Sequence, residues 1–150
     1  CNLGGRFFWS SCSDFLGRKV TYCVYFILGA ALYMSVPWTQ GQGNVTLFVI
    51  VTGLILTMYG GGFATIPAYL RDLFGSYQVG AIHGRLITAW SLAAIIGPQL
   101  VDRLSVANKK VLPAAQAYNS IFHIMVGLLA VGLIANLLVR PVDAKYHVKS

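Results

Sequence analysis

Four residues near the start of the chain bring charges of both signs together beside a glycine. They stand in the pattern Ser-Asp-x-x-Gly-Arg-Lys, directly before a long apolar stretch, and are Asp14, Gly17, Arg18 and Lys19. Glycine adopts left-handed backbone conformations without strain, so the pattern predicts a short turn. Arg18 and Lys19 are typical of a cytoplasmic membrane edge, where basic residues gather. Asp14 indicates more than an anchor, because a carboxylate at a membrane edge needs a partner.

Arg85 is a basic residue inside a predicted membrane span. It lies about five residues from the start of that span, or roughly 7–8 Å deep at 1.5 Å per helical residue. Two interpretations stay open: the guanidinium extends back to the interface or forms a structural pair, or it attracts anions at the cytoplasmic mouth of a pathway. His83 lies on a different helix face, and we favour a packed, neutral histidine over a proton carrier there.

The residue patterns of familiar enzymes are missing. The chain has no HExxH, no GxSxG and no paired carboxylates, and its three cysteines lack metal-binding spacing. All four acidic residues lie at or beyond the ends of apolar stretches: Asp14, Asp72, Asp102 and Asp143. The sequence therefore predicts neither an enzyme nor a metal or cofactor site, and it offers no mid-membrane carboxylate for a proton relay.

The distribution of charge predicts a membrane protein. The chain is 57% hydrophobic and only 10% charged, whereas soluble domains carry about 25% charged residues. Residues 20–70 and 86–101 contain no charged side chain, and residues 111–139 contain only His123. About 20 apolar helical residues cross a bilayer, so these stretches are long enough. The net charge is +7, and the basic residues that produce it lie between the apolar stretches. This distribution favours a role in membrane topology over binding to nucleic acid.

Four membrane-spanning helices are expected, which makes the fold class all-α transmembrane. The predicted spans are residues 20–36, 45–70, 79–104 and 117–139, and residues 1–9 are read as the end of an earlier span. Gly60-Gly61-Gly62 and Pro67 predict a kink or local unwinding in the second span, although the glycines are also compatible with a close helix contact. Strands are not expected, because these runs exceed the length of barrel strands and do not alternate.

Basic residues orient the spans. Seven lysines and arginines fall on one side of the predicted membrane and three on the other, with Arg85 inside a span. The side with more basic residues is expected in the cytoplasm. Both ends of the chain would then be cytoplasmic, in a multi-pass protein of the cell membrane.

The charged turn resembles the loop signature of the major facilitator superfamily, G-x-L-(A/G/S)-D-R-x-G-R-(R/K). Ser13, Asp14, Gly17, Arg18 and Lys19 match it, whereas other residues replace the opening glycine and the first arginine. The resemblance implies a twelve-helix transporter of which this chain is roughly the last third, packed against its missing N-terminal helices. It also implies that the loop aspartate pairs across the protein as the transporter changes conformation. We expect Arg71 to be the basic partner of Asp14 in a conformational latch.

A longer stretch, "MYGGGFATIPAYLRDLFGSYQVGAIHGRLITAWSLAAIIGP", resembles the oxalate:formate antiporter family. In that family the resemblance assigns cavity aromatics to Tyr59 and Phe63, and it places Trp90 where oxalate exchangers carry a buried lysine. Tyr59 and Phe63 are four residues apart and share a helix face. The missing lysine favours a monocarboxylate such as pyruvate or formate over the dianion oxalate. Substrate-binding residues are thus expected at Tyr59, Phe63, Trp90 and Arg85.

The predicted function is secondary active transport of small organic anions by alternating access, with the lipid bilayer as the surrounding medium. Two other classes remain as alternatives: a self-contained four-helix membrane scaffold or channel, and an intramembrane enzyme. A reading frame that begins just before Cys1 would favour the scaffold. A nucleophile–base pair or a metal site would be required for the enzyme.

Overall fold

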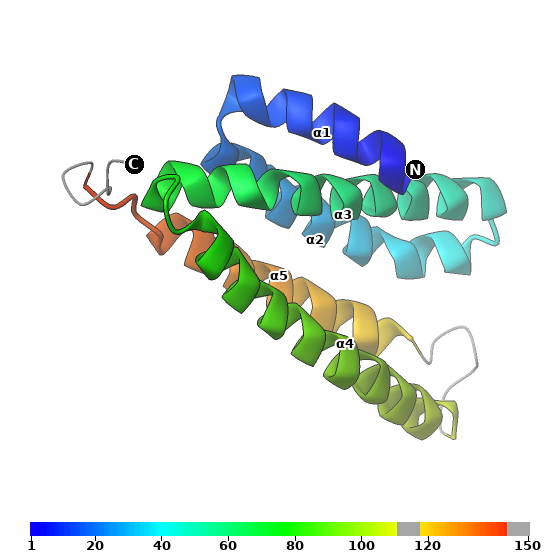
Figure 1. Cartoon of the computed structure of the whole chain (residues 1–150). Helices are drawn as coiled ribbons and strands as arrows, with labels where there is room; N and C mark the ends of the chain where they lie inside the picture. Colours follow the sequence, from blue (N-terminus) through cyan, green and yellow to red (C-terminus); the bar gives the residue numbers. More distant parts are fainter. Residues whose placement is uncertain (111–117, 144–150) are drawn as a thin grey trace.

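The chain folds into five helices in the computed structural model, which describes residues 1–110 and 118–143. Figure 1 shows them as α1 (Asn2–Leu16), α2 (Arg18–Gly41), α3 (Val45–Phe74), α4 (Val79–Lys109) and α5 (Asn119–Leu138). No strand occurs in these two described ranges. The predicted all-α class is confirmed.

Four of these helices have the length and apolar composition of membrane spans. They are the helical segments at Arg18–Thr39, Val45–Phe74, Val79–Lys109 and Asn119–Leu138. The helices run past several of the predicted span ends, because a helix continues beyond the hydrocarbon where its backbone hydrogen bonds are still made. The first span, for example, was predicted to end at residue 36, but α2 continues through Pro37 to Gly41. The loop expected before the last span falls partly at residues 111–117, outside the described residues.

The glycine triplet of α3 does not unwind the helix, and α3 is continuous from Val45 to Phe74. Two of its three glycines lie directly against α1. A side chain added at Gly60 would meet the backbone oxygen of Asn2, and one added at Gly61 would meet the side chain of Trp9. Both positions therefore serve close contact with α1, which corrects the expected unwinding. Close packing and the absence of water both favour retention of helical hydrogen bonds.

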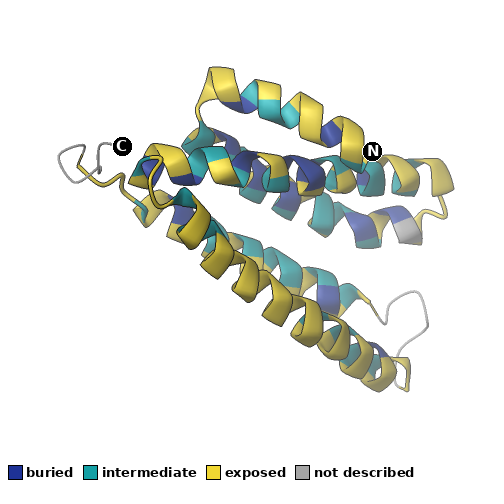
Figure 2. Ribbon diagram, in the orientation of Figure 1, coloured by how far each residue is buried: buried dark blue, intermediate teal, exposed yellow. Residues whose placement is uncertain are grey.

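Four of the helices are well packed against their neighbours, whereas α4 is not. α1 packs along α3, and α2 packs between α3 and α5, whereas α4 contacts only α3 and α5 to a small extent. Figure 1 shows α4 running along one side of the bundle with α5 behind it. No residue in the most apolar window of α4 is buried, and Figure 2 shows most of the helix as exposed. The apolar side chains of α4 are therefore available to lipid or to further helices.

One end of the bundle collects the charged turns. The α1–α2 turn, the α3–α4 turn and the end of α5 lie together there (Figure 1). Gly17 and Gly75 close the first two turns with φ angles of 85° and 78°, in the left-handed region that glycine tolerates. We call this end, which carries Arg18, Lys19 and Arg71, the basic end.

Candidate functional site

An aromatic cavity of about 280 Å³ lies between α2, α3, α4 and α5. Seven of its thirteen lining residues are aromatic: Tyr22, Tyr25, Phe26, Tyr33, Tyr59, Phe63 and Trp90. None of the described residues that line it carries a formal charge. An apolar wall with a few hydroxyl groups is the usual composition of a small-molecule site. We refer to this space as the aromatic cavity.

The structure brings together three of the residues predicted to bind substrate. The ring centroids of Tyr59 and Phe63 lie 5.3 Å apart, and those of Phe63 and Trp90 lie 4.1 Å apart. The Tyr59 and Trp90 rings complete the group at 5.6 Å. One helical turn separates Tyr59 from Phe63 along α3, and the crossing of α4 places Trp90 against both. Tyr59 and Trp90 remain half-exposed, so they form the open edge of the cavity.

Arg85 does not join this group. It lies five residues before Trp90 on α4, is exposed, and is not among the residues that line the aromatic cavity. Five helical residues correspond to a rise of about 7.5 Å and a rotation of about 140°. The guanidinium group therefore belongs to a different height and face of α4, and the expectation that Arg85 attracts the substrate elsewhere on its pathway stays a prediction.

The sequence interpretation missed the contribution of α2, which was treated only as a membrane crossing. This helix supplies Tyr22, Tyr25, Phe26 and Tyr33 to the cavity wall, with Gly29 between them. Tyr22, Phe26, Gly29 and Tyr33 follow one another at intervals of three or four residues, which places them on one helix face, and Tyr25 lies beside it. The aromatic periodicity of α2 was therefore a usable signal.

Tyr22 and Tyr69 connect the cavity wall to α5. The Tyr22 hydroxyl donates to the carbonyl oxygen of Gly62 at 2.7 Å, and its ring stacks on Tyr69 with centroids 5.0 Å apart. The Tyr69 hydroxyl donates to Oδ1 of Asn136 at 2.8 Å. The Asn136 amide nitrogen donates in turn to the backbone oxygen of Lys19 and to Sγ of Cys23, at 3.1 and 3.2 Å. Such polar contacts between helices stabilise membrane bundles, where unpaired groups have no water to bind.

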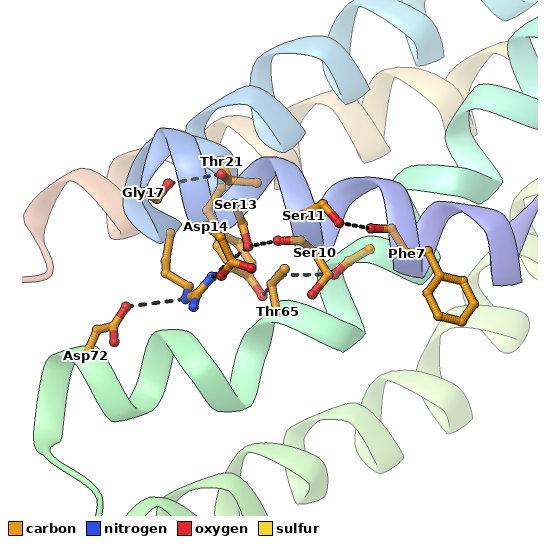
Figure 3. A network of polar contacts seen from close by, with 12 residues as sticks. Phe7, Ser10, Ser11, Ser13, Asp14, Gly17, Thr21, Thr65 and Asp72 are labelled. Atoms are coloured by element: carbon orange, nitrogen blue, oxygen red, sulfur yellow. Dashed lines mark hydrogen bonds and ion pairs between the residues drawn. The ribbon is translucent and has the colours of Figure 1, made fainter.

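Arg18 is the centre of the charged turn. Its Nη1 lies 2.6 Å from Oδ1 of Asp14 and also donates to Oγ of Ser13 at 2.8 Å. Its Nε lies 3.4 Å from Oδ2 of Asp72. Figure 3 shows the two carboxylates of Asp14 and Asp72 reaching this network from α1 and α3. The Arg18 side chain is only 17% exposed, so it joins three helices from a largely buried position.

The expected pair between Asp14 and Arg71 is not present among the described residues. Asp14 pairs with Arg18, and the α3 residue that faces the turn is Asp72. Neighbouring residues on a helix point about 100° apart, so Arg71 is directed elsewhere when Asp72 faces the turn. In the structure, the partner of Asp14 is therefore Arg18 and not the predicted Arg71.

Two further contacts hold the basic end together. Lys19 donates from Nζ to the carbonyl oxygens of Leu137 and Val139, at 3.0 and 2.7 Å, and so caps the C-terminus of α5. A lysine suits this position because the last carbonyls of a helix lack partners and carry partial negative charge. The backbone nitrogen of Val142 donates to the oxygen of Leu73 at 2.9 Å, near the end of α3. Within the described part of the chain, no group of three or more His, Cys, Asp or Glu residues is placed to hold a metal ion.

Comparison with known proteins agrees with this architecture. The family model described as Major Facilitator Superfamily matches residues 2–150. The chain is also 30% identical over 96 residues to a protein named oxalate:formate antiporter from Oxalobacter formigenes. That alignment covers 64% of this chain but 23% of the relative, so the chain spans about a quarter of the relative's length. No solved structure matches. With four membrane-length helices and a family match over almost its whole length, the chain belongs to the major facilitator superfamily.

Proposed function

We propose that this chain serves in a secondary active transporter that exchanges small monocarboxylates, such as pyruvate or formate, by alternating access. The observation that carries the proposal is the meeting of Tyr59, Phe63 and Trp90 at one cavity of about 280 Å³. Membership of the superfamily supports a role in the membrane transport of small molecules rather than in catalysis. The choice of a carboxylate, and of a monoanion, is our inference from the chemistry of the cavity.

Ring edges and hydroxyl groups suit a carboxylate. An aromatic ring carries partial positive charge at its edge, which attracts an anion lying in the ring plane. Tyr25 and Tyr59 line the cavity, and the Tyr25 hydroxyl is buried without a hydrogen-bond partner among the described residues, so both can donate to a carboxylate oxygen. These neutral donors compensate part of the desolvation of one negative charge, and a second buried negative charge would need a cation.

The size of the cavity also favours a small substrate. Pockets for drug-sized ligands range from about 300 to 1,000 Å³, and a cavity of about 280 Å³ lies just below that range. A molecule of a few heavy atoms fits within the part of the site that this chain supplies. Trp90 stands where the resemblance to oxalate exchangers expects a lysine, so a bulky neutral ring takes the place of the countercharge.

The charged turn serves as the conformational switch in this proposal. Asp14, Gly17, Arg18 and Lys19 lie at the basic end, which the excess of basic residues assigns to the cytoplasm of a cell-membrane protein. The Asp14 carboxylate is 61% exposed although it pairs with Arg18. It is therefore accessible to other helices of a full-length transporter when the two halves of such a transporter approach each other. Arg71 is exposed at the same end, where it supplies positive charge rather than the pair itself.

Counterflow in proteoliposomes that contain the full-length transporter tests the proposal. Vesicles loaded with unlabelled pyruvate should accumulate labelled pyruvate and formate, and oxalate should compete weakly. An uncharged sugar of similar size serves as the control substrate. Accumulation of the sugar without any response to the three carboxylates would show that the protein is not a carboxylate transporter.

A further inference from the structure

A second hollow lies close to the aromatic cavity, towards the basic end. It has a volume of about 260 Å³, and its lining includes Lys19, Tyr69, Asp72 and Pro141. We call it the basic-end pocket. Tyr22 lines the aromatic cavity and Tyr69 lines the basic-end pocket. The two rings stack with centroids 5.0 Å apart and planes at 23°. One stacked pair of side chains therefore stands between two hollows of similar volume.

Both rings of this pair are fixed through their hydroxyl groups. Tyr22 is held on α3 by its hydrogen bond to the Gly62 carbonyl at 2.7 Å. It also accepts a hydrogen bond from Oγ1 of Thr65 at 3.3 Å, which occupies a second site on its oxygen. Tyr69 is held on α5 by Oδ1 of Asn136 at 2.8 Å. Neither ring can swing aside without breaking a hydrogen bond in a region without bulk water.

Asn136 is suited to hold Tyr69 in place. It is 7% exposed, and its oxygen and its nitrogen are both engaged. The nitrogen reaches the backbone of Lys19 and the thiol of Cys23, both on α2. A single amide therefore joins α2, α3 and α5 at the level of the stacked rings. Because all these bonds depend on one side chain, the position of Tyr69 is determined by Asn136.

We propose that the stacked pair Tyr22–Tyr69, positioned by Asn136, is the wall that closes the aromatic cavity towards the basic end and limits the length of the carboxylate it accepts. This inference rests on the proposed function, because it names the residues that select substrates by size. Removal of the wall would join the two hollows and allow an acyl chain to extend from the aromatic cavity into the basic-end pocket. Tyr69 does not line the aromatic cavity, so an effect of Tyr69 on substrate choice would come through the wall.

Competition by 2-oxo acids of increasing chain length tests the wall in the full-length transporter. Labelled pyruvate uptake is measured against unlabelled straight-chain acids of three to eight carbons. Wild type should discriminate against the longer acids. In Tyr69→Ala, inhibition should strengthen by about fourfold for each added methylene that becomes buried, while the KM for pyruvate stays close to wild type. Tyr69→Phe keeps the stacked ring but loses the hydrogen bond to Asn136, so its length limit should lie between those of wild type and Tyr69→Ala.

Tyr33→Ala is the matched control for this experiment. Tyr33 lines the same cavity from the same helix but is not among the residues of the basic-end pocket. The substitution removes the same side chain without joining the two hollows. If Tyr33→Ala strengthened inhibition by the long-chain acids as much as Tyr69→Ala does, cavity volume alone would set the length limit. That result would refute the proposed role of the Tyr22–Tyr69 pair. The same conclusion would follow if Tyr69→Ala left the length preference unchanged.

The thiol of Cys23 provides a test that does not depend on transport. Its Sγ lies 3.2 Å from Nδ2 of Asn136, next to the wall. In full-length protein with Cys23 as its only cysteine, held in nanodiscs, a charged maleimide should label Cys23 slowly. Labelling should become several-fold faster in Tyr69→Ala or, if that variant does not fold, in Tyr69→Leu. Tyr69→Phe, which lacks the hydrogen bond to Asn136, should label at an intermediate rate, and Tyr33→Ala should label like wild type.

The two measurements separate the inference from the proposed function. A protein that transports no carboxylate but shows faster Cys23 labelling in Tyr69→Ala would refute the proposed substrate and support the wall. A monocarboxylate transporter in which neither length preference nor labelling responds to Tyr69→Ala would support the function and refute the wall.

Discussion

Phe63 on α3 and Trp90 on α4 pack edge to face, with ring centroids 4.1 Å apart and planes at 75°. The contact is informative because α4 is otherwise poorly packed in the described structure. It positions the open edge of the aromatic cavity by joining α3 to α4, the least buried of the membrane-length helices among the described residues. Under the proposed function, substrate selection and the placement of α4 would therefore involve the same two side chains.

Replacement of Trp90 by lysine should shift selectivity towards dianions. The new ammonium group would stand at the edge of a cavity whose described lining is uncharged, where it would favour the second carboxylate of oxalate. We expect the oxalate-to-pyruvate ratio of counterflow rates to rise about tenfold, which corresponds to about 1.4 kcal/mol. Trp90→Phe keeps an uncharged ring and serves as the control. If the oxalate-to-pyruvate ratio were unchanged in Trp90→Lys, Trp90 would not be part of the substrate site.

Substitution at Asp72 should impair the conformational cycle more than substitution at Arg71. Asp72→Asn weakens the contact with Arg18, whereas Arg71→Gln leaves the Asp14–Arg18–Asp72 contacts in place. Exposed ion pairs are worth about 0.2–1 kcal/mol, and partial burial of Arg18 favours the upper part of that range. We therefore expect a several-fold fall in maximal transport rate for Asp72→Asn, with little change in KM. A larger effect of Arg71→Gln would contradict this prediction and support the Asp14–Arg71 pair expected from the sequence.

Gly61→Ala should destabilise the contact between α1 and α3. The added methyl group would meet the side chain of Trp9, and overpacking of this kind costs about 1–3 kcal/mol. Thermal unfolding of the purified full-length protein in detergent should show a lower midpoint. Gly62→Ala is the control on the same helix, because its added methyl group meets nothing within 4 Å among the described residues. Equal midpoints for the two variants would contradict the close contact at Gly61.

Lys19→Ala should loosen the end of α5. The substitution removes two hydrogen bonds to the carbonyl oxygens of Leu137 and Val139 and the favourable charge at a helix C-terminus. Such a charge is worth about 0.3–1 kcal/mol when exposed and up to about 2 kcal/mol when partly buried. Amide hydrogen exchange in the last turn of α5 should become faster. Lys110→Ala, at the exposed end of α4, should leave that exchange unchanged.

The fold class was predictable because its signal is repeated along the chain. Runs without charge, such as residues 20–70, have one physical explanation at this length, and local packing does not alter it. Tyr59, Phe63 and Trp90 were singled out from the sequence, by helical spacing for the first two and by resemblance for all three, and their role in binding substrate stays a prediction. Their meeting in space depends on the crossing of α3 and α4, which sequence spacing does not determine.

The errors arose where one residue or one neighbouring helix decides the outcome. The choice between Arg71 and Asp72 at the charged turn depends on a helical rotation of about 100°, and the packing of α3 against α1 and α2 sets that rotation. The role of Gly60 and Gly61 depends on α1, which lies more than forty residues earlier in the chain. The aromatic face of α2 was visible as a periodic pattern, but the same pattern is expected of a helix that packs without binding anything.

The cap that Lys19 provides for α5 also has a consequence for the order of biosynthesis. Its two acceptor residues are 118 and 120 positions later in the chain. At a translation rate of about 5–20 residues per second, they emerge about 6–24 s after Lys19. During that interval the ammonium group has none of its final acceptors, so lipid phosphates or water must solvate it at the membrane surface. Completion of α5 is therefore the event that allows the basic end to reach its final arrangement.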